Sequence, residues 1–259
     1  MKHILFGVSF LMAAGTASFN CVADDLTVVS NVTNNGHAAG TSTDYMSADH
    51  IRHSQSQGTD VIFDLKTGTM TNIDTKKKTY YVMTKQDMEA IQAKMNERMN
   101  DPRVKQAMSA MQGLSSSMAA STEVKKTGVT RKVAGYSCEE WLISMGSMMT
   151  MTECVTGDLK YPAQTWTALA DFNESMRKSM SGFGGSAKSG ADFAEKMKSI
   201  KGFPVASTTT VDAGAMKSIT ASEVTEVNRA SIPASIWQVP SGFTQVENPA
   251  LKSLQEHGR

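Results

Sequence analysis

The stretch "DVIFDLKTGTMTNIDTKKKTYYVM", residues 60–83, decides the fold class of this chain. It contains three runs rich in β-branched and aromatic residues, at 61–65, 69–73 and 79–82, separated by short segments of Gly, Asp, Thr and Lys. Such runs are typical of β-strands, and turn residues between them predict an antiparallel meander. We therefore expect an antiparallel sheet at the centre of the protein.

More strands are predicted on both sides of the meander. One covers residues 26–32 and is followed by a Gly/Asn-rich loop through Gly40. Strands resume at 205–211 and 218–227, and a short helical turn near 233–237 closes the domain.

Two segments between the strands have a helical period instead. In residues 85–121 one apolar stripe ends at Asn100, and Asp101 with Pro102 forms an N-cap and first turn for a second helix. Residues 162–200 carry two further apolar stripes. We predict an α+β fold for residues 24–259, a single domain in which helical pairs inserted at about 85–121 and 162–200 cover one face of a curved open antiparallel sheet.

The first 23 residues have the pattern of a secretory signal peptide. Lys2 precedes an apolar run from Ile4 to Gly15, and small residues lead to a cleavage site after Ala23. Lipidation at Cys21 is the alternative, although a lipidation site needs small residues before the cysteine. We expect an exported protein, which is periplasmic if the source is a Gram-negative bacterium.

Charge and hydropathy exclude two classes of partner. Loss of Lys2 with the leader leaves 25 of the 26 basic side chains, which equals the 25 acidic ones. Without a basic excess, nucleic-acid binding is not expected. No later stretch reaches the roughly 18 apolar residues of a membrane helix, so no transmembrane anchor is expected. The oligomeric state is not indicated.

Cleavage of the leader leaves Cys138 and Cys154 as the only cysteines. An even pair in an oxidising compartment predicts a disulfide, and a reduced metal-binding pair is the alternative. The 15 residues between the cysteines give a stabilisation of about 3 kcal/mol in the loop-entropy description.

The segment "MGSMMTMTEC", residues 145–154, contains the turn and the second strand of a predicted hairpin that the disulfide closes. If the two cysteines lie directly opposite each other, the turn is centred on Gly146. Trp141 then lies opposite Met151 and Ile143 opposite Met149, on an apolar face. Packing is therefore the first explanation for Met149 and Met151.

Soft-metal binding is the alternative explanation for this methionine cluster. Met145 and Met148 lie near the turn, where their thioethers could bind Cu(I) or Ag(I). The histidines add little to this alternative: His50 and His53 are three residues apart and point to opposite faces of a strand, and we expect solvated surface side chains.

The sequence contains no GxSxG, HExxH or phosphate-loop motif, and the disulfide leaves no free thiol as a nucleophile. No enzyme activity and no cofactor are expected. Ordinary packing of the helices on the sheet is the first explanation for the many methionines, and a deformable apolar cavity or lid is the alternative, because their side chains adapt to irregular partners. Our candidates for contacting an apolar ligand are Met95, Met99, Met108, Met111, Trp141, Met149, Met151 and Trp166.

Several segments together resemble an exported bacterial family catalogued only as a domain of unknown function, whose fold is related to the lipoprotein-localisation carriers. The matching segments are residues 64–83, "RKVAGYSCEEWLI" (131–143), "KGFP" (201–204) and residues 222–243. The resemblance implies a half-barrel, an open and strongly curved sheet whose concave face is filled by the helices. In the carriers that apolar hollow holds acyl chains, so we expect a lipid or lipoprotein acyl chain as ligand. An envelope interaction module without ligand is a further alternative.

Overall fold

The computed structural model describes residues 25–104, 106, 122–145, 149–162, 165, 195–212 and 217–256. The predicted leader, residues 1–23, lies outside this part of the chain, so the cleavage site and the domain boundary stay predictions.

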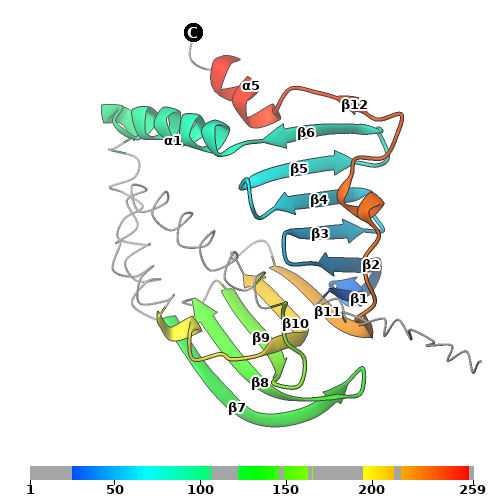
Figure 1. Ribbon diagram of the computed structural model, residues 1–259. Coiled ribbons are helices and arrows are strands. Elements are labelled where there is room, and N and C mark those ends of the chain that lie inside the picture. The colour runs from blue at the N-terminus through cyan, green and yellow to red at the C-terminus, as the bar shows by residue number, and fades with distance from the viewer. Residues whose placement is uncertain are drawn as a thin grey trace, which may run out of the picture.

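In the described residues, twelve strands form one open sheet in the order β12-β6-β5-β4-β3-β2-β1-β11-β10-β9-β8-β7. The strands are β1 (Leu26–Asn34), β2 (His37–Met46), β3 (His50–Gln55), β4 (Thr59–Asp64), β5 (Thr69–Asp74), β6 (Thr79–Met83), β7 (Thr122–Val133), β8 (Tyr136–Met145), β9 (Met149–Thr156), β10 (Phe203–Asp212), β11 (Lys217–Asn228) and β12 (Thr244–Gln245). Neighbouring strands are antiparallel, except that β12 pairs with β6 in parallel. The sheet is strongly curved, so that β7–β10 lie at an angle to β3–β6 (Figure 1). The predicted open, curved and mainly antiparallel sheet is confirmed.

The meander of β4, β5 and β6 has the predicted position, and aspartates fix both of its turns. The Asp64 carboxylate accepts hydrogen bonds from the backbone N–H groups two and three residues later, and Asp74 repeats the arrangement. Side-chain acceptors of this kind stabilise a turn without help from the rest of the fold. For this reason the local sequence was sufficient to predict both turns.

The predicted loop through Gly40 is wrong. The connection between β1 and β2 is the two-residue turn Asn35-Gly36, whose φ angles are 49° and 78°. Two successive residues with positive φ make a type I′ turn, which matches the twist of a hairpin and favours Asn-Gly. Strand β2 therefore already begins at His37.

Helix α1 (Lys85–Met99) is confirmed, and its N-terminus is closed by a capping box. Thr84 Oγ1 accepts from the Asp87 backbone N–H, while the Asp87 carboxylate accepts from the Thr84 backbone N–H. Asp101 accepts from the Arg103 backbone N–H, as expected for an N-cap. Residues 107–121 and 166–194 are outside the described part of the chain, so the two helical pairs stay a prediction.

The C-terminal part adds elements that the sequence analysis did not predict in full. A 3₁₀ turn, η1 (Ala234–Trp237), occupies the predicted place, and β12 follows it. The short helix α5 (Pro249–Glu256), not predicted, contacts α1 beyond β6 (Figure 1). No helix of the described residues is long and apolar enough to cross a membrane.

The segment around η1 packs against one side of β3, β4 and β5. The Trp237 ring stacks on His50 with centroids 5.3 Å apart, and the Arg52 guanidinium donates to the Ile236 carbonyl oxygen at 2.6 Å. Arg52 also forms an ion pair with Asp60. We call this side of the strands the Arg52 face; Asp60 and Ile62 on β4 and Ile73 on β5 belong to it and are buried.

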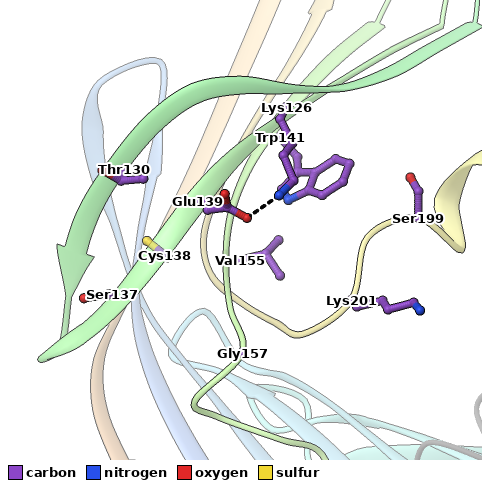
Figure 2. A pocket seen from close by; sticks show the side chains of 10 residues that line it. All are labelled: Lys126, Thr130, Ser137, Cys138, Glu139, Trp141, Val155, Gly157, Ser199 and Lys201. Carbon is purple, nitrogen blue, oxygen red and sulfur yellow. Dashed lines mark hydrogen bonds and ion pairs between the residues drawn. The ribbon is translucent and has the colours of Figure 1, made fainter.

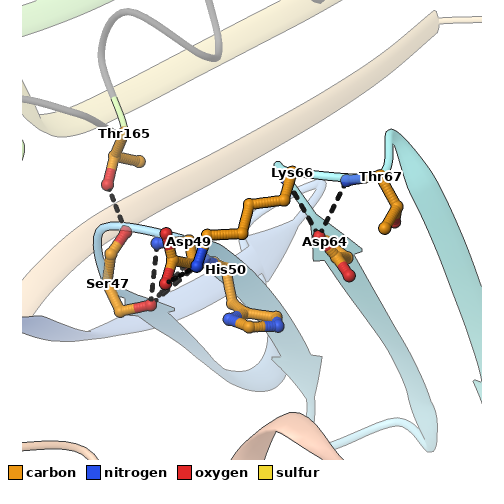
Figure 3. A network of polar contacts seen from close by, with 7 residues as sticks. All are labelled: Ser47, Asp49, His50, Asp64, Lys66, Thr67 and Thr165. Carbon is orange, nitrogen blue, oxygen red and sulfur yellow. Dashed lines mark hydrogen bonds and ion pairs between the residues drawn. The ribbon is translucent and has the colours of Figure 1, made fainter.

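The turn between β2 and β3 joins two remote parts of the chain (Figure 3). Ser47 Oγ accepts from the His50 backbone N–H at 3.1 Å, and its carbonyl oxygen accepts from the Thr165 hydroxyl. On the other side, the Lys66 ammonium binds the Asp49 carboxylate at 2.7 Å. Thr165 is fully buried, so this contact fixes the start of the second insertion on the sheet.

Candidate ligand-binding face

An apolar row crosses six neighbouring strands on the side of the sheet opposite the Arg52 face. Its six members are directly opposed from one strand to the next: Leu26, Met46, Ile51, Phe63, Met70 and Met83. Directly opposed residues point to the same side of a sheet. We call this side the Met46 face. Leu26 and Met46 are buried, whereas the four members on β3 to β6 are half-buried.

A second row lies on the Met46 face two residues along each strand. Its members are Val28, Asp44, His53, Val61, Asn72 and Tyr81. Asp44 Oδ1 lies 2.6 Å from His53 Nδ1, and Gln55 Nε2 lies 3.0 Å from His53 Nε2. The hydrogen bond that His53 donates to the Asp44 carboxylate raises the pKa of His53 above its usual value, although burial opposes this effect. The second row therefore places the polar pair of Asp44 and His53 beside the apolar row.

Asn72 is the exception in this polar arrangement. Its Nδ2 atom is buried and has no hydrogen-bond partner among the described residues. Buried amide donors are normally satisfied, because leaving one unpaired costs about 1–3 kcal/mol. Its neighbours across the strands are Val61 and Tyr81, so the donor lies at the edge of the apolar row.

The other half of the sheet continues the Met46 face. Trp141 lies opposite Glu153, and the row passes through Ser207 and Ser222 to Val32 on β1. Burial raises the pKa of the Glu153 carboxyl. Burial also raises the pKa of Tyr161 to about 12, with a contribution from the charge of Glu153.

The predicted disulfide joins Cys138 to Cys154, with an S–S length of 2.05 Å and Cα atoms 5.3 Å apart. Both residues are buried in the main core cluster. The predicted register is wrong by two residues, because Cys154 lies opposite Glu140 and not opposite Cys138. The bridge is therefore diagonal, a possibility that the direct-opposition argument did not consider.

The corrected register keeps each side chain on its predicted face but changes its neighbours. Ile143 lies opposite Met151, Met145 lies opposite Met149, and Trp141 has Glu153 as its neighbour instead of a methionine. Trp141, Met149 and Met151 are half-buried. These three candidates thus share one face, and Ile143 between them is buried.

The remaining candidates are only partly described. Met95 and Met99 belong to α1, and Met145 to β8, but their side chains lie outside the description. Met108, Met111, Met148 and Trp166 lie outside the described residues altogether. Contacts of the helical methionines with a ligand stay a prediction.

Sequence reasoning missed the members of the Met46 face on β2 to β6. His53 was expected to be a solvated side chain, but it is half-buried beside Asp44. The available signal was the meander itself, because the turn after Asp64 places Phe63 opposite Met70. In the described part of the chain, no group of three or more His, Cys, Asp or Glu side chains could hold a metal ion.

A family profile with the description "Domain of unknown function (DUF4412)" matches residues 30–243. No curated protein matches the chain. Among solved structures, the chain is similar to PNGF-II, with 11% identity, a TM-score of 0.41, and coverage of 91% of this chain and 33% of that one. It is also similar to MucB, with 12% identity, a TM-score of 0.38, and coverage of 86% and 62%. MucB has also been solved with MucA, from Pseudomonas aeruginosa. The chain thus spans less than two thirds of either neighbour.

Proposed function

The chain belongs to the DUF4412 family, which matches most of its length, and we propose that it is an exported, non-enzymatic protein that binds an apolar ligand on the Met46 face. The ligand class that fits is a lipid or the acyl chain of a lipoprotein. The disulfide between Cys138 and Cys154 supports export, because such bonds persist in oxidising compartments.

The apolar row of the Met46 face is the observation that carries the proposal. Six residues on six neighbouring strands lie directly opposite one another, from Leu26 on β1 to Met83 on β6. At about 4.8 Å between strands, five steps make a stripe of about 24 Å. An extended alkyl chain placed along its four half-buried members, Ile51, Phe63, Met70 and Met83, would contact each of β3 to β6 once, while Leu26 and Met46 continue the stripe into the core.

The composition of the row also supports a changeable partner. Three of the six residues are methionines, whose flexible thioether side chains adapt to irregular apolar shapes. The four members on β3 to β6 are half-buried, whereas Met46 is buried. The unpaired Nδ2 of Asn72 supplies one hydrogen-bond donor beside it, as expected in a mostly apolar site with few polar groups.

The proposal is tested by native mass spectrometry of the protein purified gently from the exported fraction. We expect extra mass that disappears on denaturation and matches a lipid. The variant Met70→Gln should lose this mass, because the polar side chain of similar size disrupts the centre of the stripe, while the matched control Met70→Leu should keep it. Bare polypeptide in the wild type would contradict tight lipid binding and favour an interaction module without ligand.

Soft-metal binding is the second candidate, and the corrected hairpin register favours it in one respect. Met145 and Met149 are the last directly opposed pair of β8 and β9, so two methionines meet where the strands end. Thioether ligands suit Cu(I) and Ag(I). If the protein binds Ag(I) under this hypothesis, the triple variant Met145→Leu/Met148→Leu/Met149→Leu should abolish uptake; unchanged uptake would exclude these three methionines as the site.

A further inference from the structure

Two segments that are remote in the sequence, residues 131–143 and 201–204, meet at one pocket. The pocket has a volume of about 440 Å³, within the usual range for small-ligand sites. Trp141 and Val155 line one side, and Lys201 lies on the loop across from them (Figure 2). Trp141 continues the Met46 face, so the pocket lies on the same side of the sheet as the apolar row.

Gly202 explains why Lys201 lies at this pocket. Its φ angle is +134°, and a Cβ at this position would lie 2.3 Å from the Thr156 carbonyl oxygen. Only glycine allows so close an approach of the loop to the end of β9. The next residue, Phe203, is buried and packs on the Tyr161 ring with centroids 4.6 Å apart. The backbone on the C-terminal side of Lys201 is therefore held firmly at the rim.

The pocket combines an apolar wall with a positive charge that no described residue compensates. The Lys126 ammonium lies 5.4 Å from the centroid of the Trp141 ring and 2.6 Å from Glu139 Oε2, so Glu139 balances its charge. Lys201 has no ion-pair partner among the residues that the structure describes. The three charged side chains that line the pocket thus sum to one positive charge.

We propose that this pocket binds the anionic end of an amphipathic molecule, with Lys201 contacting the anion and Trp141 and Val155 contacting the adjoining apolar part. A carboxylate or a phosphate would supply the same charge. The inference rests on the proposed function, since the apolar remainder of the ligand would occupy the Met46 face, but it assigns recognition to different residues.

The test compares alkyl probes of one length that differ in their head group, namely dodecanoate, dodecyl phosphate and dodecanol, on the full mature chain. We expect Lys201→Gln to weaken the affinity for dodecanoate or dodecyl phosphate roughly tenfold or more, because one charge-assisted contact is lost. The affinity for dodecanol should stay unchanged. Lys201→Arg should preserve binding. The matched control is Lys198→Gln, which changes a lysine of the same loop that pairs with Glu195 and does not line the pocket.

A local readout shows where the anion binds. In protein labelled with 5-fluorotryptophan, the Trp141 resonance is assigned as the ¹⁹F signal that Trp141→Phe removes. This resonance should shift when dodecanoate or dodecyl phosphate binds. The probe of these two that binds more tightly identifies the head group. The inference is overturned if Lys201→Gln weakens the anions no more than Lys198→Gln, or if the Trp141 resonance stays unmoved while they bind. Dodecanol binding in that case leaves the proposed function intact, whereas failure of all three probes would contradict both.

Discussion

On the Arg52 face of β3–β5, the buried polar groups have partners and the C-terminal segment covers the sheet. The side chains of Arg52 and Asp60 are only 11% and 8% exposed, and they bind each other. On the Met46 face of the same strands, Asn72 Nδ2 is buried with no partner in the part of the chain that the structure describes, and Met70 is half-buried. The two faces have the same backbone, so the difference lies in their side chains and in what packs on them.

This difference separates stability from binding. A face whose polar groups are paired and whose apolar groups are covered contributes to folding, and it has no unpaired polar group or accessible apolar surface that a ligand could contact. A face with a half-buried apolar row and an unpaired donor contributes less to folding. A ligand that buried the rest of this apolar surface and accepted from the donor would gain binding free energy. Four predictions test this contrast.

The largest effect is expected from Arg52→Ala. The substitution leaves the Asp60 carboxylate buried without its partner and removes the hydrogen bond to the Ile236 carbonyl oxygen. Removing one member of a buried pair costs about 3–5 kcal/mol. Urea unfolding should show this loss, whereas Lys66→Ala, which breaks the exposed pair with Asp49, should cost less than about 1 kcal/mol. Equal losses would mean that the Arg52 face is not the stabilising one.

A matched pair of truncations on β5 compares the faces directly. Ile73 on the Arg52 face is 1% exposed, while Met70 on the Met46 face is half-buried. We expect Ile73→Ala to lower the free energy of unfolding by about 2–5 kcal/mol. Met70→Ala should cost about 1 kcal/mol, because part of its side chain is already in water. Thermal unfolding of both variants is the check, and a larger loss for Met70→Ala would reverse our assignment of the faces.

Substitution of Asn72 tests how the unpaired donor affects the free energy of unfolding. Asn72→Leu removes a buried group without a partner, so the free energy of unfolding should stay unchanged or rise by up to about 1 kcal/mol. Asn248 also has an unpaired Nδ2, but its Oδ1 accepts from the Ala250 backbone N–H at the start of α5. Asn248→Leu should therefore cost about 1 kcal/mol as the loss of a helix cap. Strong destabilisation by Asn72→Leu would show that its amide is satisfied after all.

The smallest expected effect is the pH dependence of the free energy of unfolding that the titration of His53 causes. The bond to Asp44 raises the pKa of His53, so the native state holds its proton more tightly than the unfolded state. This contribution to stability is complete below the usual pKa of about 6.5 and is lost as the pH rises through the raised value. His53 is 39% exposed, which limits the effect to at most about 1 kcal/mol.

The variants His53→Gln and Asp44→Asn should both flatten the fall in unfolding free energy above pH 6.5. Glu153, whose pKa burial also raises, contributes a fall that begins at lower pH, near the usual carboxyl value of 4.5, and is unaffected by either variant. A wild-type profile that rises with pH above 6.5 would contradict the assigned sign.

Local sequence was sufficient for the features that depend on local chemistry. The turns of the meander, the N-cap at Asp101 and the even cysteine pair all act within one short segment or through one covalent bond. The Asn35-Gly36 turn was equally local, but its signal was overlooked within a longer Gly/Asn-rich stretch. The cysteines also predicted the correct faces of the β8–β9 hairpin, because a register error of two residues preserves the alternation.

The candidate site could not be predicted in the same way. The members of the apolar row come from six strands, and which of them lie opposite one another depends on five strand registers at once. The pair of Asp44 and His53 depends on the register of β2 and β3, and the pocket at Trp141 depends on a loop some 60 residues later in the chain. Periodicity in one segment carries no information about such contacts.

The most direct test of the central claim is an NMR titration of the mature protein, labelled with ¹³C in the methionine methyl groups, with dodecanol. If the Met46 face binds an apolar chain, the assigned resonances of Met46, Met70 and Met83 should shift together in one saturable transition. Binding that moves other methionines but leaves these three unchanged, or no binding at all, would contradict the claim.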